Sequence, residues 1–68
     1  MEIHQFIKER RSLLGITQQD LADISGIGLR TIKQIETGKG NPALHTLQKV
    51  VDVLGLEIVL KVKNTANL

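Results

Sequence analysis

The sequence contains no cysteine, one aromatic residue and no long apolar run, and each absence excludes a class of protein. Without cysteine there is neither a disulfide framework nor a thiolate metal site. No run is apolar for long enough to span a membrane, and the first residues lack the apolar core and cleavage site of a secretory signal. Because Phe6 is the only aromatic residue, the stacking platforms that bind RNA or single strands are missing. We therefore expect a cytoplasmic protein.

The charge is nearly balanced, with nine Lys and Arg against seven Asp and Glu and a formal net charge of +2. An excess this small permits a nucleic-acid partner without indicating one. The 68 residues form one domain, near the lower limit at which a single core is stable unaided. Isoleucine, leucine and valine must supply that core.

Side chains that could support catalysis or bind a metal ion are scattered along the chain. His4 and His45 fall in different predicted helices, and no cysteine or carboxylate cluster accompanies them. Asp20 and Asp23 are better explained as a helix cap and a solvated residue. No glycine-rich phosphate loop follows a strand. We predict no enzyme, no cofactor and no metal site.

Hydrophobic periodicity predicts four helices within residues 1–55, the first two of them before residue 27. The first ends at Gly15 and carries apolar residues at helical spacing, namely Ile3, Phe6, Ile7, Leu13 and Leu14. Thr17 is the expected N-cap of the second, with Asp20 in a capping-box position and Gly26 as the stop. The apolar side of this second helix consists of Leu21, Ala22 and Ile24.

The third and fourth predicted helices follow the same logic. The third spans about residues 28–37, with Ile32 and Ile35 inward and Gly38 as the stop. Asn41 is the expected N-cap of the fourth helix, and Pro42 its first residue. The fourth helix ends at Gly55 and has the cleanest apolar stripe in the chain, formed by Leu44, Leu47, Val50, Val51 and Leu54.

After Gly55 the spacing of apolar residues changes to the alternation of a strand. Residues 56–63 alternate apolar side chains, Leu56, Ile58, Leu60 and Val62, with mostly polar ones. A lone strand leaves its backbone unpaired, so we expect residues 56–63 to form a dimerisation strand that pairs with a second copy and buries these four side chains. A fifth helix is the alternative interpretation. Residues 64–68 are expected to form a flexible tail.

The second and third predicted helices have the pattern of a helix–turn–helix corner. Ala22 is small where the two helices would cross, and Gly26 permits the positive φ of a tight turn. With Ile32 and Ile35 inward, a rotation of 100° per residue places Arg30, Lys33 and Gln34 on the outward side with Thr37.

These residues resemble the Cro/CI/Xre repressor family over about residues 3–55. The similarity rests on Arg11, "TQQDLA", "TIKQIETGK", "NP" and "TLQKVVDVLG" at the family's spacing. It implies a mostly α fold, a four-helix (possibly five) lambda-repressor-like DNA-binding domain, with the C-terminal strand pairing across a homodimer. The ending "LGLEIVLKVK" is similar to the HipB-like antitoxin branch. Gly28 stands where the family more often has Ser or Thr, so one hydroxyl that could contact phosphate is absent.

The third helix is the expected DNA-reading element. Arg30 and Gln34 have the side chains that read guanine and adenine in the major groove, and the resemblance assigns base reading to Leu29, Arg30, Lys33 and Gln34. We expect four further residues, Gln18, Thr37, Lys39 and Asn41, to contact the DNA backbone. The resemblance also implies a structural ion pair between Arg11 and Glu36.

The resulting functional prediction is a homodimeric transcriptional repressor bound to a palindromic operator on double-stranded DNA. We expect it to be the antitoxin of a toxin–antitoxin pair that represses its own operon and binds a toxin kinase. A stand-alone phage-type or metabolic repressor is the alternative. A protein–protein module without DNA binding is the alternative from another class.

Overall fold

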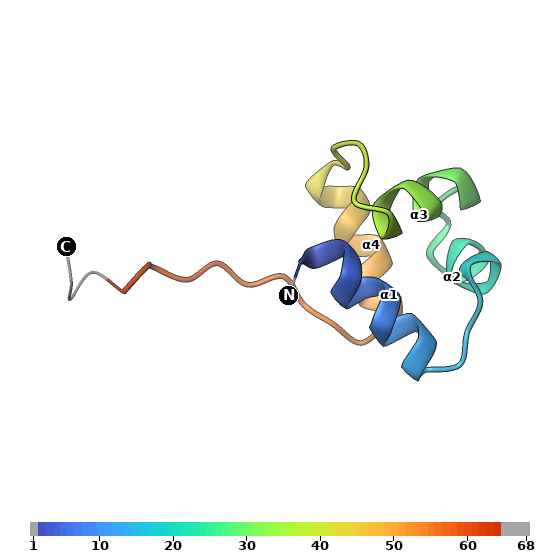
Figure 1. Ribbon diagram of the computed structural model, residues 1–68, viewed down its shortest axis with the longest axis horizontal. Coiled ribbons are helices and arrows are strands. Elements are labelled where there is room, and N and C mark those ends of the chain that lie inside the picture. Colours follow the sequence, from blue (N-terminus) through green and yellow to red (C-terminus); the bar gives the residue numbers. More distant parts are fainter. Residues whose placement is uncertain (1, 65–68) are drawn as a thin grey trace.

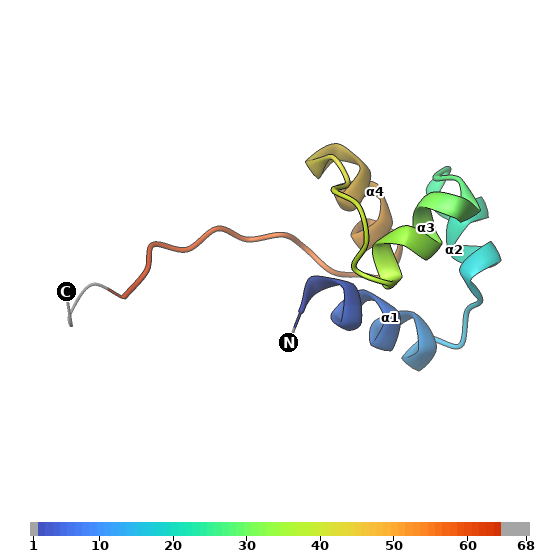
Figure 2. The ribbon, with the colours of Figure 1, turned by 45° about the horizontal axis from the view of Figure 1, so that its top comes forward.

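The computed structural model describes residues 2–64, and these contain four α-helices, in agreement with the periodicity (Figure 1). The helices are α1 (Ile3–Leu13), α2 (Gln18–Ser25), α3 (Leu29–Glu36) and α4 (Leu44–Val53). Helix α2 packs against both α3 and α4, and α1 packs against α3. The helices form one body, from which the chain after α4 runs away (Figure 2).

The core collects aliphatic side chains from every helix. Its buried members are Ile7, Leu21, Ala22, Ile32, Ile35, Val50, Val51 and, directly after α4, Leu54. Burying one large aliphatic side chain stabilises a fold by about 1.5–3 kcal/mol. Because α3 contributes Ile32 and Ile35, it is fixed to the body along one side only, and its other side faces solvent.

Glycine residues come directly after the ends of the helices. This confirms the helix ends predicted from the sequence. Gly15, Gly38 and Gly55 follow α1, α3 and α4, and each has a φ near +70°. At the end of α3, the Gly38 N–H donates to the Ile35 carbonyl and the Lys39 N–H to the Gln34 carbonyl, both at 3.1 Å. This pair of bonds defines a Schellman motif, which requires the left-handed conformation that glycine adopts without strain.

The N-terminus of α2 has the predicted capping box. The Thr17 hydroxyl accepts from the Asp20 backbone N–H at 3.0 Å, and the Asp20 carboxylate accepts from the Thr17 N–H at 2.9 Å. The pKa of the Asp20 carboxyl is lowered, mainly by the hydrogen bond that it accepts from the Thr17 backbone N–H and further by the Thr17 hydroxyl. The capping box therefore fixes the residue at which α2 begins.

The apolar stripes of the helices extend beyond the core. Several of their members are exposed, namely Ile3, Phe6, Leu13, Leu14, Ile24 and Leu44. A four-helix body of this size has one small core, so a helix buries only the residues that face its neighbours. Ile24, on the predicted apolar side of α2, is 65% exposed.

The predicted start of the fourth helix is wrong by two residues. Asn41 and Pro42 precede α4, and Ala43 is its N-cap, with an extended backbone and no side-chain capping bond. Ala43, two residues after Asn41, has the extended backbone that precedes the first turn of α4. Residues 41–43 therefore continue the loop that leads from α3 to α4.

Residues 56–64 form neither a strand nor the fifth helix that was the alternative. Leu56 is still anchored, because its N–H donates to the Val51 carbonyl at 2.9 Å and its side chain packs on the core. Beyond it the chain is extended, and Leu60 and Val62 are 95% and 93% exposed. No residue from 2 to 64 is assigned to a strand, so residues 57–63 have no strand partner among the described residues. Of the predicted tail, residues 65–68 lie outside the described residues.

Candidate nucleic-acid interface

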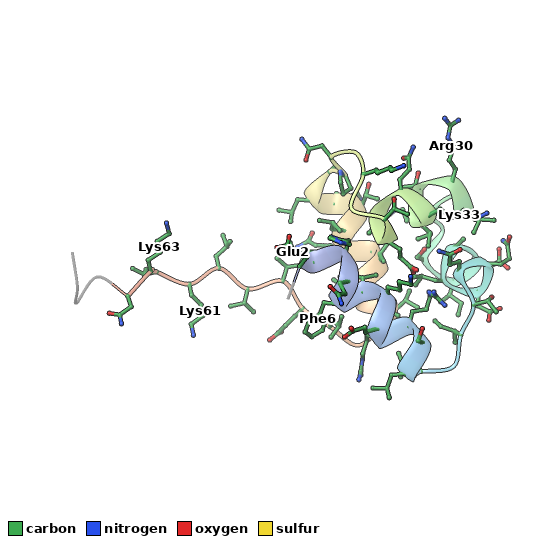
Figure 3. All side chains as sticks on the ribbon, viewed as in Figure 1. Glu2, Phe6, Arg30, Lys33, Lys61 and Lys63 are labelled. Atoms are coloured by element: carbon green, nitrogen blue, oxygen red, sulfur yellow. The ribbon has the colours of Figure 1, made fainter. Side chains whose placement is uncertain are left out.

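Helix α3 presents a polar, basic surface to solvent. Leu29, Arg30, Lys33, Gln34 and Thr37 line one shallow hollow along the helix. Leu29 packs partly on the core, whereas the other four are exposed. Arg30 projects away from the helical body (Figure 3). The structure thus brings together all four predicted base-reading residues, and Thr37 with them; we call these five residues the α3 surface.

The polar groups of the α3 surface have few partners in the protein. Among the described residues, the side chains of Arg30, Lys33 and Gln34 form no hydrogen bond or ion pair. The Thr37 hydroxyl donates to the Gln34 carbonyl at 3.0 Å, which leaves its oxygen free to accept. Two cations and an amide are therefore available for a ligand that offers acceptors and negative charge.

The dimensions of α3 suit a DNA groove. Its eight residues give a helix about 12 Å long, which the major groove admits. A guanidinium can donate two hydrogen bonds to a guanine, and a side-chain amide can pair with an adenine edge. The arrangement is thus chemically suited to reading base edges.

A buried polar cluster holds α3 against α1 and α2. The Arg11 guanidinium donates to the two carboxylate oxygens of Glu36 at 2.7 and 3.0 Å, and to the Ile16 carbonyl at 2.9 Å. The side chains of Arg11 and Glu36 are only 13% and 2% exposed. The hydrogen bond to Glu36 raises the pKa of Arg11 further above its usual value. Burial of the guanidinium opposes this effect, and the opposite charge of Glu36 adds to it.

The side chain of Gln18, predicted to contact the DNA backbone, belongs to the same cluster. Its amide nitrogen donates to a Glu36 carboxylate oxygen at 3.1 Å. An amide nitrogen carries two N–H donors, so one remains for another acceptor. The cluster therefore orients Gln18 at the first residue of α2, where backbone N–H groups also lack helical partners.

The other two predicted backbone contacts lie in the loop after α3. Lys39 and Asn41 are exposed, and the backbone of Lys39 is fixed by the Schellman motif. They follow Thr37 in the loop at the C-terminal end of α3.

No pattern in the sequence indicated the contacts made by two side chains, Arg10 and His4. The Arg10 guanidinium donates to the Leu54 carbonyl at 2.9 Å, which ties α1 to the end of α4. His4 lies against Gly38, where an added Cβ would come within 2.9 Å of its ring. Both contacts join residues more than thirty positions apart, and local patterns carry no information about such pairs.

The predicted dimerisation residues are graded in exposure along the chain. Leu56 is half-buried, Ile58 is 41% exposed, and Leu60 and Val62 are almost fully exposed.

In the described part of the chain, no three His, Cys, Asp or Glu side chains gather as a metal site would require. No helix within residues 2–64 has both the length and the apolar character needed to cross a membrane.

Two short helices that meet at a tight turn, with the second anchored inward and polar outward, define the helix–turn–helix class. The turn here is three residues long, and Gly26 adopts the positive φ that it requires. The chain belongs to the helix-turn-helix family, whose model matches residues 7–60.

Curated relatives of the chain are named as transcription regulators. The cryptic phage CTXphi transcriptional repressor RstR of Vibrio cholerae is 34% identical over 58 residues, which cover 85% of this chain and 52% of RstR. An HTH-type transcriptional regulator of Haemophilus influenzae is 47% identical over 57 residues, 79% of this chain and 58% of that protein. The regulator PuuR of Escherichia coli is 38% identical over 52 residues, 76% of this chain and 28% of PuuR. The chain thus spans about half of the first two and less of PuuR.

Proposed function

We propose that this chain is a DNA-binding transcriptional repressor that places α3 in the major groove. The observation that carries the proposal is the α3 surface, on which Arg30, Lys33 and Gln34 have no partner among the described residues. Polar side chains on a rigid helix, fixed from behind by Ile32 and Ile35, are suited to reading base edges. The names of the relatives support the same function.

Each residue of the proposed interface has a role set by its chemistry. Arg30 reads a guanine with two hydrogen bonds, Gln34 reads an adenine, and Leu29 contacts a thymine methyl group. Lys33 adds a donor beside them. Four residues grip phosphates, namely Gln18, Thr37, Lys39 and Asn41.

We infer that the repressor binds a palindromic operator as a homodimer. The support is the extended segment after Leu56, whose apolar side chains are exposed and whose backbone lacks a strand partner within the described chain. A two-fold axis would place two α3 helices about 34 Å apart, one turn of DNA, so that each reads one half-site.

The test of the α3 assignment uses duplexes selected from random DNA by the wild-type protein. We expect Arg30→Ala and Gln34→Ala each to weaken binding by about 1–3 kcal/mol, or roughly 5- to 150-fold, in fluorescence anisotropy titrations. Lys49→Ala is the matched control, because Lys49 is an exposed cation on α4, outside the α3 surface. Equal losses in Arg30→Ala and Lys49→Ala would overturn the assignment. Failure to select any duplex would instead favour a protein–protein module.

The biological role has two candidate forms, each favoured by one observation. The name of RstR favours a stand-alone phage-type repressor, and we propose this form first. The exposed apolar segment around Leu60 and Val62 favours an antitoxin that also binds a toxin kinase. Purification of the tagged chain with its neighbouring gene product separates them. A stoichiometric complex with a kinase would establish the antitoxin, and its absence the stand-alone repressor.

A further inference from the structure

A second hollow lies between α1 and the C-terminal end of α3, next to the α3 surface. The first turns of α1 lie beside that end of α3 (Figure 1, Figure 2), where His4 closely approaches Gly38. Thr37 lines both this hollow and the hollow of the α3 surface. We call it the α1 hollow, and it is lined by His4, Gln5, Lys8, Glu9, Ser12, Leu13, Glu36 and Thr37.

The side chains of α1 in this hollow form one row. His4, Lys8 and Ser12 recur every four residues, so they lie on one face of the helix. Lys8 and Ser12 are exposed, and their side chains form no hydrogen bond or ion pair with any residue from 2 to 64. An ammonium and a hydroxyl both donate hydrogen bonds to an anionic oxygen. The row therefore offers a cation and a donor that the described part of the chain leaves unused.

The two carboxylates of the α1 hollow do not cancel the charge of Lys8. Glu36 is buried, and Arg11 balances its charge in the ion pair described above. Glu9 is turned about 100° further round α1 than Lys8. It also lines a neighbouring hollow with Arg10, so it lies at the edge of the α1 hollow. The side chain of Lys8 thus gives the row a positive charge.

We propose that Lys8, together with the hydroxyl of Ser12, binds a backbone phosphate of DNA in the α1 hollow. The site rests on the proposed function, and it adds α1 to the elements that contact the DNA. The phosphate belongs to the strand that Gln18 and Thr37 contact in the proposed complex.

The α1 hollow lies between these two proposed phosphate contacts. Thr37 lines it at the end of α3, and Glu36, in its wall, accepts from the Gln18 amide at 3.1 Å. A strand that touches both Gln18 and Thr37 therefore passes the α1 hollow. Each strand carries one phosphate for about 3.4 Å of helix axis, so a phosphate is present wherever the strand passes. The flexible four-carbon stem of Lys8 lets its ammonium reach that phosphate.

The two side chains of the site contribute differently to binding. The ammonium of Lys8 neutralises one phosphate and releases counterions, so it makes binding more dependent on salt. The hydroxyl of Ser12 is neutral, so its hydrogen bond leaves the salt dependence unchanged. Neither contact reads a base, because phosphates carry no sequence information.

Salt dependence tests the charge of the site on duplexes selected by the wild-type protein. We expect Lys8→Ala to reduce the steepness of log K against log salt by about 0.9 for each bound chain. The loss of affinity should then shrink roughly eightfold when the salt concentration rises tenfold. It should have the same size on unrelated duplexes. Lys8→Arg should keep the wild-type slope, and Ser12→Ala should weaken binding without changing the slope.

Lys49→Ala is the matched control for the charge. Lys49 is an exposed lysine on α4, outside the α1 hollow, and it has no hydrogen bond or ion pair among the described residues. Alanine is a good helix former, so both variants should keep the helix content of the wild type in circular dichroism. An unchanged slope in Lys8→Ala, or an equal change in Lys49→Ala, would overturn the site.

Neutral methylphosphonate groups, placed at one phosphate of the duplex at a time, locate the contact. We expect the effect of Lys8→Ala to disappear when one particular phosphate is neutral. Gln18→Ala and Thr37→Ala identify their own phosphates in the same way. The Lys8 phosphate should lie on the stretch of one strand that these two phosphates bound. A Lys8 phosphate outside that stretch, or none at all, would overturn the site.

The same titrations separate the site from the function on which it rests. If the wild type binds its selected duplex and Arg30→Ala weakens binding while Lys8→Ala does not, the α1 site alone is overturned. If the wild type binds no duplex, the repressor is overturned and the α1 site with it.

Discussion

At the scale of single residues, the structure depends on a polar cluster around Glu36 that joins three helices through one ion pair and one amide hydrogen bond. Glu36 on α3 accepts from Arg11 on α1 and from Gln18 on α2. A buried pair of this kind adds little over an apolar pair of the same size, but removing one partner leaves an uncompensated charge. The pair therefore fixes how α3 sits against its neighbours more than it raises the overall stability.

Glu36→Ala should accordingly lower the free energy of unfolding by about 3–5 kcal/mol in urea titrations followed by circular dichroism. The guanidinium of Arg11 would stay largely buried without a carboxylate. The double variant Arg11→Met with Glu36→Leu is the control and should recover most of this loss, because it removes both charges. A loss below about 1 kcal/mol in Glu36→Ala would contradict the role of the pair.

Asp20 gives the chain a defined dependence on pH. Its pKa is lowered in the folded state, so its carboxylate stabilises the fold above the pKa of the unfolded chain. That contribution is lost as the pH falls through the lowered folded pKa, below about pH 4. Unfolding titrations of the wild type and Asp20→Asn should therefore differ most near neutral pH and converge as the pH falls through the lowered folded pKa. A difference that stayed constant down to pH 2 would contradict the capping box.

At the scale of the elements, the helices could be predicted because their ends are local signals. Thr17 with Asp20, and the glycines at 15, 26, 38 and 55, act on their own turns, and the helices begin or end beside them. The prediction that Asn41 caps α4 was wrong, although Asn is a favourable N-cap residue. The path of the chain from α3 to α4 sets the loop that Asn41 occupies. Local patterns predict where a helix stops better than which loop precedes it.

The part of the candidate site that lies on one helix could also be predicted from the sequence, whereas the contacts between helices could not. Rotation along one helix is enough to gather Arg30, Lys33 and Gln34 on one side, and the structure places them there. The bond from Gln18 to Glu36 depends on how three helices pack, so no local pattern reports it. The exposure of Phe6 and Leu44 also depends on packing, because helical spacing does not reveal how many neighbours a helix has.

Two glycine positions test the helix ends separately. Gly26 and Gly38 have φ values of +75° and +73°, but only at Gly38 would a Cβ meet another residue, His4. Gly26→Ala should cost about 1–2 kcal/mol from backbone strain, and Gly38→Ala measurably more. Adding His4→Ala to Gly38→Ala should remove the excess. Equal costs in thermal unfolding, with no coupling between positions 4 and 38, would contradict the contact.

At the scale of the whole molecule, the α3 surface and the extended residues after Leu56 lie apart. The α3 surface projects from one end of the body, and residues 57–64 leave it at another (Figure 1, Figure 3). Changes in one surface should therefore leave the other intact. That separation allows DNA reading and pairing to be measured independently, since residues far apart contribute almost additively.

Lys39 should contribute to binding through charge alone. If each protomer of a dimer places Lys39 on one phosphate, Lys39→Ala should flatten the dependence of log K on log salt by about 0.9 for each contact, or roughly 2 for the dimer. It should weaken all duplexes similarly, because phosphates carry no sequence information. A variant with an unchanged salt slope would contradict the phosphate contact. Lys49→Ala is the control and should leave the slope as in the wild type.

The central claim is that α3 reads bases, and a cycle between one side chain and one base pair tests it most directly. Affinities of the wild type and Arg30→Ala would be measured for the selected operator and for operators with each base pair of the half-site changed in turn. We predict that Arg30→Ala causes no further loss of affinity on operators in which one particular G·C pair of each half-site has been changed. The coupling energy between Arg30 and that base pair should be about 1–3 kcal/mol. A loss of the same size on every duplex would contradict the account.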